Sequence, residues 1–298
     1  MLHDPILAAT TRVTAIDKYA AQLSAQGWCI VPDAMPVEAV AALDSDLKRG
    51  FDETPFCQGG FYGGRTKRFG RLLARSPHAA PFVQQDIILG VTERILAPWC
   101  DSIPLNLTQA IALHPGALPQ LPHRDQDMWR GEIGRIEYLV NVMWPFTDYN
   151  ADNGATLIWP ESHGLRAFDL EPPCPPIVAE MQPGAALIFL GSTLHGAGGN
   201  ASETVRRGMI VSYCLGWLKS YENQFLAYPP PTARRFAPEL AALVGYRQHR
   251  PNLGNYEGRC PSILLSDGDD RPLGAIDALR PDQVALVDAF VKDQRRQA

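Results

Sequence analysis

The sequence lacks the cysteine spacing of a disulfide scaffold or a zinc site. Its six cysteines form no Cys-x-x-Cys pair and lie far apart along the 298 residues: Cys29, Cys57, Cys100, Cys174, Cys214 and Cys260. Such spacing is typical of reduced thiols. The chain also has no run of about 18 apolar residues that could span a membrane. Residues 1–12 show no basic segment followed by an apolar one. We therefore expect a cytoplasmic protein, neither secreted nor inserted in a membrane.

Strongly biased charge is absent as well. The net charge is −5, and the only block of like charge is near the end of the chain, at residues 292–296. This balance argues against nucleic acid or an anionic membrane as the main partner. A hydrophobic content of 46% with 20% charged residues is typical of a soluble globular protein. No internal repeat or long linker divides the chain, so we expect a single domain over residues 1–298.

The first hundred residues show mostly helical periodicity. The pattern predicts helices at 14–26, from 33 or 36 to 50, and at 77–96, with one strand at 28–31. Between them, residues 51–70 alternate glycines with the aromatics Phe56, Phe61, Tyr62 and Phe69. We interpret this segment as a long loop, and a flap over a pocket stays open as an alternative.

From about residue 104 the hydrophobic period changes from 3.6 to 2. The predicted strands are 104–114, 135–144, 155–159, 185–190 and 208–215. Many short strands separated by turns, without helices between them, favour an antiparallel barrel or jelly roll. The fold class is therefore mainly β with flanking helices. Further helices are expected near 238–244 and at 281–292.

The most informative stretch is residues 120–127, which contains His123 and Asp125. If the stretch is extended, these two side chains leave the same face and can reach one ion together. An imidazole and a carboxylate suit a divalent first-row metal, and a further imidazole completes the two-His-one-carboxylate set of non-haem Fe(II) oxygenases. His195, 70 residues after Asp125, is the candidate. A His-x-Asp triplet such as residues 123–125 is common in proteins, so it is not by itself evidence of a metal site. The alternatives are a pair of residues on a surface strand and a hydrogen-bonded histidine in the core.

Three further motifs follow the triplet in order. They lie at residues 153–164, 181–185 and 190–200, and Arg206 follows His195 by eleven residues. Together with residues 120–127 they resemble the phytanoyl-CoA dioxygenase family of Fe(II)/2-oxoglutarate oxygenases. Residues 66–68, 212–218 and 222–224 resemble the branch that tailors terpenoid and alkaloid natural products.

The resemblance implies a double-stranded β-helix, a cupin-like jelly roll, with its core at about 101–217, a helical part before it and a tail at 218–298. It implies that His123, Asp125 and His195 hold iron and that 2-oxoglutarate and dioxygen take the remaining positions. It places Arg206, rather than its neighbour Arg207, on the far carboxylate of 2-oxoglutarate.

The resemblance also places polar contacts from Gln120 and Thr156 on the cosubstrate, and it makes His163 a structural residue. Because the carboxylate of Asp125 is present, it implies hydroxylation, desaturation, epoxidation or rearrangement rather than halogenation.

The organic substrate is expected to be an apolar small molecule of natural-product biosynthesis, covered by the aromatics of residues 51–70 and by the tail that begins at Trp217. Two other classes of protein remain open. One is a non-oxidative cupin-like isomerase or metal-bound sensor, which has no need for Arg206. The other is a catalytically inactive binding protein. A homodimer through the proline-rich tail and a monomer are both compatible with the sequence.

Overall fold

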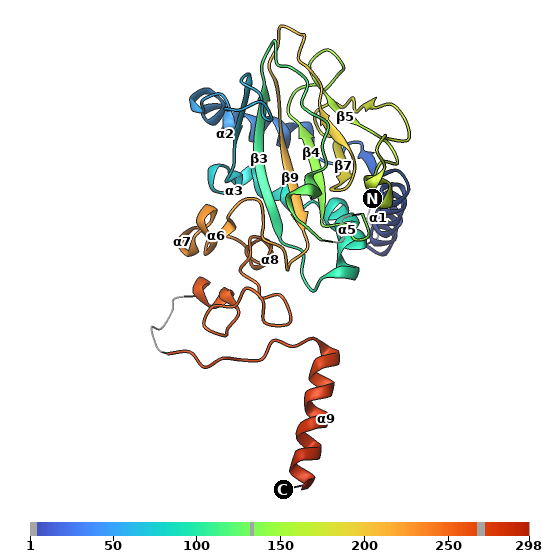
Figure 1. Cartoon of the computed structure of the whole chain (residues 1–298). Helices are drawn as coiled ribbons and strands as arrows, with labels where there is room; N and C mark the ends of the chain where they lie inside the picture. The colour runs from blue at the N-terminus through green and yellow to red at the C-terminus, as the bar shows by residue number, and fades with distance from the viewer. Residues whose placement is uncertain (1–4, 132–133, 267–271, 298) are drawn as a thin grey trace.

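The computed structural model describes residues 5–131, 134–266 and 272–297. Two antiparallel sheets face each other (Figure 1). The larger sheet has the strand order β1-β7-β4-β9-β3-β2, and the smaller has the order β6-β5-β8. This pair of sheets is the expected jelly roll, and the predicted mainly β fold with flanking helices is confirmed.

The strands of the larger sheet are β1 (Trp28–Val31), β2 (Thr66–Phe69), β3 (Leu105–Leu113), β4 (Leu139–Pro145), β7 (Ala186–Leu190) and β9 (Arg206–Cys214). Those of the smaller sheet are β5 (Thr156–Ile158), β6 (Ile177–Val178) and β8 (His195–Ala197). The α-helices are α1 (Pro5–Gln26), α2 (Val37–Glu53), α3 (Leu72–Arg75), α4 (Ala80–Val83), α5 (Asp86–Leu96), α6 (Gln224–Ala227), α7 (Pro230–Ala233), α8 (Pro238–Leu243) and α9 (Pro281–Gln297).

Helices cover one face of the larger sheet. Helix α1 packs along α5 and against β1, α5 lies against β4, and α2 contacts β2. The main core fills this layer, with fully buried residues such as Leu43, Phe82 and Trp144. The other face of the sheet, toward β5 and β8, is left to a smaller apolar cluster and to the polar residues of the functional site. Every residue of β4 is buried, because helices cover one of its faces and the jelly-roll interior the other.

Three element predictions need correction. The helix predicted at 77–96 is interrupted, because the side chain of Gln85 caps a new helix by accepting a hydrogen bond from the backbone N–H of Ile88 (2.8 Å). The first helix begins at Pro5 rather than residue 14. The segment 51–70 is not only a loop, since its last part forms β2 and pairs with β3.

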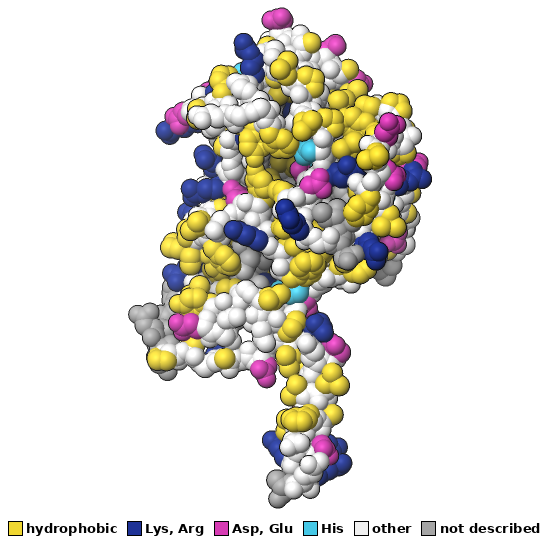
Figure 2. Space-filling model, viewed as in Figure 1, with side chains coloured by type: hydrophobic (Ala, Val, Ile, Leu, Met, Phe, Trp, Pro, Cys, Tyr) yellow, Lys and Arg dark blue, Asp and Glu magenta, His cyan; other side chains and the backbone are white. Residues whose placement is uncertain are grey.

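The C-terminal part of the chain lies below the sheets, with α9 projecting away from the body (Figure 1). Hydrophobic side chains are exposed along this helix (Figure 2), among them Leu286 and Phe290. None of the helices in the described ranges has the length and apolarity that crossing a membrane requires.

Candidate metal centre

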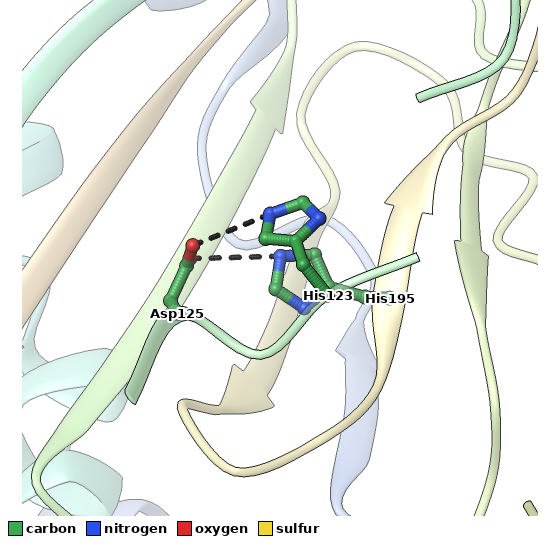
Figure 3. Close-up of side chains that lie close together, drawn as sticks. All are labelled: His123, Asp125 and His195. Atoms are coloured by element: carbon green, nitrogen blue, oxygen red, sulfur yellow. Dashed lines mark ion pairs between the residues drawn. The ribbon is translucent and has the colours of Figure 1, made fainter. Parts of the chain in front are cut away.

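The side chains of His123, Asp125 and His195 converge inside the jelly roll (Figure 3). The backbones of the two histidines form an isolated β-bridge, with N–H to O distances of 2.9 and 3.0 Å. The carboxylate of Asp125 lies 3.4 Å from Nε2 of His123 and 3.5 Å from Nε2 of His195. One potential ligand atom from each residue lies within 4.8 Å of the others, so a single ion can contact all three.

The local backbone differs from the prediction at Asp125. The chain is extended only as far as Arg124 (φ −118°, ψ 124°), and Asp125 begins a 3₁₀ turn, Asp125–Met128. The turn directs the carboxylate back toward the two imidazoles. The three side chains therefore meet, although not through the strand geometry that the sequence suggested.

Both imidazoles are oriented by backbone carbonyls. Nδ1 of His123 lies 2.8 Å from the carbonyl oxygen of Leu121, and Nδ1 of His195 lies 3.0 Å from that of Thr193. A carbonyl can only accept, so each Nδ1 carries the proton and donates. Each Nε2 then offers its lone pair toward Asp125, which is the arrangement of metal-binding histidines. The donor set fits Fe(II).

Asp125 is held in the ionised form. Burial raises the pKa of its carboxyl, but when the rings are protonated at Nε2 as well, attraction from His195 and hydrogen bonds from both imidazoles outweigh burial and hold this pKa far below its ordinary value. The side-chain amide of Asn141 on β4 also donates to its Oδ2 at 3.0 Å. An anionic oxygen and two imidazole nitrogens are thus presented together.

A polar network behind the triad ties its two segments together. The guanidinium of Arg124 donates to the carbonyl oxygens of Ser192 (3.0 Å) and Ser162 (3.2 Å). The Ser162 hydroxyl accepts from the backbone N–H of Leu194 (2.9 Å), and that of Ser192 donates to Glu137. The segment that carries His123 and Asp125 is thereby linked to the segment that carries His195 by side-chain hydrogen bonds as well as by the β-bridge.

Glu137 makes the stability of this network depend on pH. Burial raises the pKa of its carboxyl to about 7, against hydrogen bonds from Ser192 that lower it. Because the pKa is raised in the folded state, the contribution of Glu137 is present at acid pH and is lost as pH rises through about 7. We expect the thermal midpoint to fall as pH rises from about 4.5 to about 7, and the fall to be smaller in Glu137→Gln. Equal falls in both proteins, measured by circular dichroism, would contradict this.

The triad lines a cavity of about 440 Å³, to which the predicted cosubstrate residues also contribute. Gln120, Thr156 and Arg206 all line it. Arg206 is 2% exposed and lies 4.3 Å from the ring centre of Tyr149. One of its terminal nitrogens donates to the carbonyl oxygen of Gly154 (2.9 Å), while its Nε is buried without a partner. The guanidinium therefore retains donors for an incoming anion.

Arg207 faces the opposite side of β9. It forms a two-point ion pair with Asp44 of α2, with distances of 2.9 and 2.6 Å. Between the two neighbouring arginines, only Arg206 reaches the cavity.

A second arginine, which was not predicted from the sequence, lies in the same cavity as Arg206. Arg68 on β2 lines the cavity, donates to the side chain of Gln109 (3.0 Å) and lies 4.8 Å from the ring centre of Tyr62. Within the described part of the chain no carboxylate forms an ion pair with it. Burial lowers the pKa of its guanidinium. The sequence feature that could have indicated Arg68 is the Thr66-Lys67-Arg68 segment. It was used only for the family resemblance, because the strand β2 that places Arg68 in the cavity was not predicted.

The four aromatics of residues 51–70 have different places. Phe61 and Tyr62 line the cavity, and the ring of Phe61 packs edge-on against His123 (4.8 Å). The hydroxyl groups of Tyr62 and Tyr221 share a hydrogen bond across the cavity. Phe69 instead belongs to the main core, where it packs on Phe51 (5.0 Å). Phe56 does not line the cavity either, and its ring packs edge-on against His114 (4.9 Å). The expectation that all four aromatics cover one pocket is therefore wrong for Phe56 and Phe69.

The sequence matches the family model of phytanoyl-CoA dioxygenase over residues 23–208, more than half of the chain. The chain belongs to the phytanoyl-CoA dioxygenase family. Among curated relatives, this dioxygenase is 28% identical over 255 residues to the multifunctional dioxygenase ausE of Aspergillus calidoustus, covering 78% of this chain and 84% of the relative. It is 34% identical over 201 residues to the dioxygenase aneA of Aspergillus aculeatus, covering 63% and 66%.

Solved structures share its fold at low sequence identity. The epimerase SnoN in complex with Fe3+, alpha ketoglutarate and nogalamycin RO aligns with a TM-score of 0.58 at 16% identity, covering 91% of this chain and 97% of SnoN. HygX from Streptomyces hygroscopicus, with nickel, 2-oxoglutarate and hygromycin B bound, aligns with a TM-score of 0.55 at 14% identity, covering 69% and 89%. The jelly roll is thus a fold that such enzymes use.

The family assignment confirms the predicted enzyme class. The protein is an Fe(II)- and 2-oxoglutarate-dependent dioxygenase, and the non-oxidative cupin-like alternative is not favoured.

Proposed function

We propose that His123, Asp125 and His195 hold the Fe(II) of this dioxygenase, and that Arg206 binds the far carboxylate of 2-oxoglutarate. The observation that supports this most directly is the convergence of two Nε2 atoms and one carboxylate in a cavity that also contains the buried guanidinium of Arg206, whose Nε has no hydrogen-bond partner. The bound metal, with 2-oxoglutarate, supplies the activation of dioxygen and the release of succinate and CO2.

The protein residues fix the geometry. The carbonyls of Leu121 and Thr193 keep both imidazoles in the tautomer that offers Nε2, and Asn141 holds Asp125 from the other side. These contacts keep ligand positions fixed before any ion binds, which lowers the cost of ordering the site.

Two arginines serve the anionic end of the cosubstrate. Arg68 and Arg206 come from β2 and β9, the two strands that flank β3, and both line the cavity. Two guanidiniums without carboxylate partners are costly to bury in isolation. A dianionic ligand offsets that cost, which supports a role for Arg68 beside Arg206. Gln120 and Thr156 supply further polar contacts in the same cavity.

The organic substrate is proposed to be an apolar small molecule, such as a natural product. Phe61, Leu107, Met128, Leu139 and Ile210 all line the cavity. Such a lining favours burial of apolar surface over recognition of a sugar.

Phe61→Ala tests this substrate class. We expect the KM of the organic substrate to rise about tenfold, because an aromatic contact worth about 1.4 kcal/mol is lost. The cosubstrate should keep its own KM within twofold. Phe56→Ala is the matched control, since Phe56 belongs to the same segment but does not line the cavity. A change confined to the cosubstrate would refute the assignment.

The overall proposal is tested by product analysis. Purified protein supplied with Fe(II), 2-oxoglutarate and oxygen should form succinate, faster with candidate terpenoid or alkaloid substrates than without them. Metal removal by a chelator should stop succinate formation, and added Fe(II) should restore it. Succinate formation that survives complete metal removal would refute the proposal.

We also propose that residues 1–298 act as one dioxygenase domain in the cytoplasm. Strands β1 and β2, from the largely helical first part, belong to the same sheet as β3, β4, β7 and β9, which supports a single unit. All six cysteines are free thiols, which supports a reducing compartment.

A further inference from the structure

A second cavity adjoins the metal centre. It measures about 460 Å³ and shares lining residues with the first cavity, namely Phe61, Tyr62, Arg68, Ile111, Gln120, Ala197 and Arg206. Its other walls come from the glycine-rich residues 60–66 and from residues 113–119, the loop after β3. Several of these wall residues are exposed, including Gly64 and Leu118. The second cavity therefore connects solvent with the two inner arginines.

Positive charge lines this cavity from its outer to its inner end. Arg65 is exposed, whereas Arg68 and Arg206 lie deeper, and the lining residues that the structure describes include no aspartate or glutamate. Arg65 has no ion pair or side-chain hydrogen bond within the described ranges. Its guanidinium packs over Gly116, where a side-chain Cβ would lie 3.5 Å from Nε. A Cβ at that distance would be in ordinary contact, and glycine is favoured at position 116 by its φ of +78°.

The neighbouring electrostatics agree with a positive field. The pKa of His114, on the same loop, is lowered first by burial and then by the positive charges of Lys67 and Arg65. The first cavity differs, because its lining includes the carboxylates Asp125 and Asp127 as well as apolar side chains. The two openings thus suit ligands of different chemistry.

We propose that the second cavity is the entry route of 2-oxoglutarate and that Arg65 steers this dianion toward Arg68 and Arg206. The apolar part of the first cavity beside Met128 and Leu139, which do not line the second cavity, is then left to the organic substrate. Uncompensated positive charge along a passage raises the association rate of an anion, and salt screens the effect. This inference rests on the proposed role of Arg206.

The test is the rate of 2-oxoglutarate binding, followed anaerobically by stopped-flow absorbance of the Fe(II) chelate band. At low ionic strength we expect association to slow by about threefold in Arg65→Gln and about tenfold in Arg65→Glu. Dissociation should be unchanged, and the differences should shrink strongly in about 0.5 M salt. Arg235→Glu, the same charge change at an exposed arginine outside both cavities, is the control.

A blocking variant tests the route itself. Gly64 lines the second cavity, and a Cβ added there meets no atom within 4 Å, so a side chain can be accommodated. We expect Gly64→Trp to slow association and dissociation of the cosubstrate by the same factor, leaving its Kd unchanged. The KM of the organic substrate should not change.

The outcomes separate this inference from the function on which it rests. Unchanged association rates in both Arg65→Glu and Gly64→Trp overturn the entry route, as does an equal slowing in Arg235→Glu. A faster dissociation rather than a slower association in Arg65→Glu makes Arg65 a binding contact and also overturns it. If Arg206→Gln leaves the affinity for the cosubstrate unchanged, the proposed role of Arg206 fails instead.

Discussion

Asp125→Ala is expected to lower succinate formation about a thousandfold, which corresponds to about 4 kcal/mol of lost transition-state stabilisation. Asp125 supplies the only carboxylate among the three converging ligand atoms, and its environment keeps it ionised. Alanine leaves two neutral imidazoles, which bind a divalent ion weakly and leave its charge uncompensated. The measurement is initial-rate succinate formation together with the iron content of the purified protein.

Two variants control for indirect effects of the Asp125 substitution. Asp125→Glu keeps the charge but displaces it by one methylene, so it should retain more iron than alanine and remain well below wild type in turnover. Asp288→Ala removes an exposed carboxylate on the projecting helix α9 and should match wild type. Full turnover-dependent succinate formation in Asp125→Ala would remove this residue from the metal centre.

Arg206→Gln should strongly reduce the preference for 2-oxoglutarate over a 2-oxo acid that lacks the second carboxylate, such as 2-oxobutanoate. In wild type we expect a preference of about a hundredfold or more in kcat/KM, because a buried bidentate contact with a carboxylate contributes about 2 to 5 kcal/mol. In the variant the preference should be much smaller, because only Arg68 remains beside the second carboxylate. A ratio of two rates in one preparation is insensitive to partial loss of folded protein.

Arg207→Gln is the matched control for Arg206. It removes the neighbouring arginine, which lies on the opposite face of β9 and pairs with Asp44. We expect a lower thermal midpoint, since a partly buried ion pair is broken, with the preference for 2-oxoglutarate intact. Loss of the preference in Arg207→Gln but not in Arg206→Gln would reverse the assignment.

Much of the site was predictable because its motifs are local and ordered along the chain. His123, Asp125 and His195 were selected from residue type and spacing, and the structure brings them together in one cavity with Arg206, Gln120 and Thr156. Alternation with period 2 also predicted strands close to β3 and β4, and apolar runs between proline- and glycine-rich turns predicted strands close to β7 and β9.

The features that could not be predicted depend on tertiary contacts, which the local sequence pattern does not reveal. Strand β2 has only four residues and is stabilised by pairing with β3, so neither its existence nor the place of Arg68 followed from periodicity. Phe69 looked equivalent to Phe61 in sequence, yet pairing with Ala110 directs it into the core. Similarly, the turn at Asp125 arises because the backbone N–H of Gln126 donates to the carbonyl oxygen of Gly191, a tertiary contact.

The most direct test of the proposed metal centre is anaerobic titration of the purified protein with Fe(II) and 2-oxoglutarate, in wild type and in His195→Ala. We predict the weak visible charge-transfer band of the chelate in wild type and its loss in the variant. That result would show that His195 belongs to a site binding metal and cosubstrate together. Absence of the band in iron-loaded wild type, or an undiminished band in His195→Ala, would contradict the assignment.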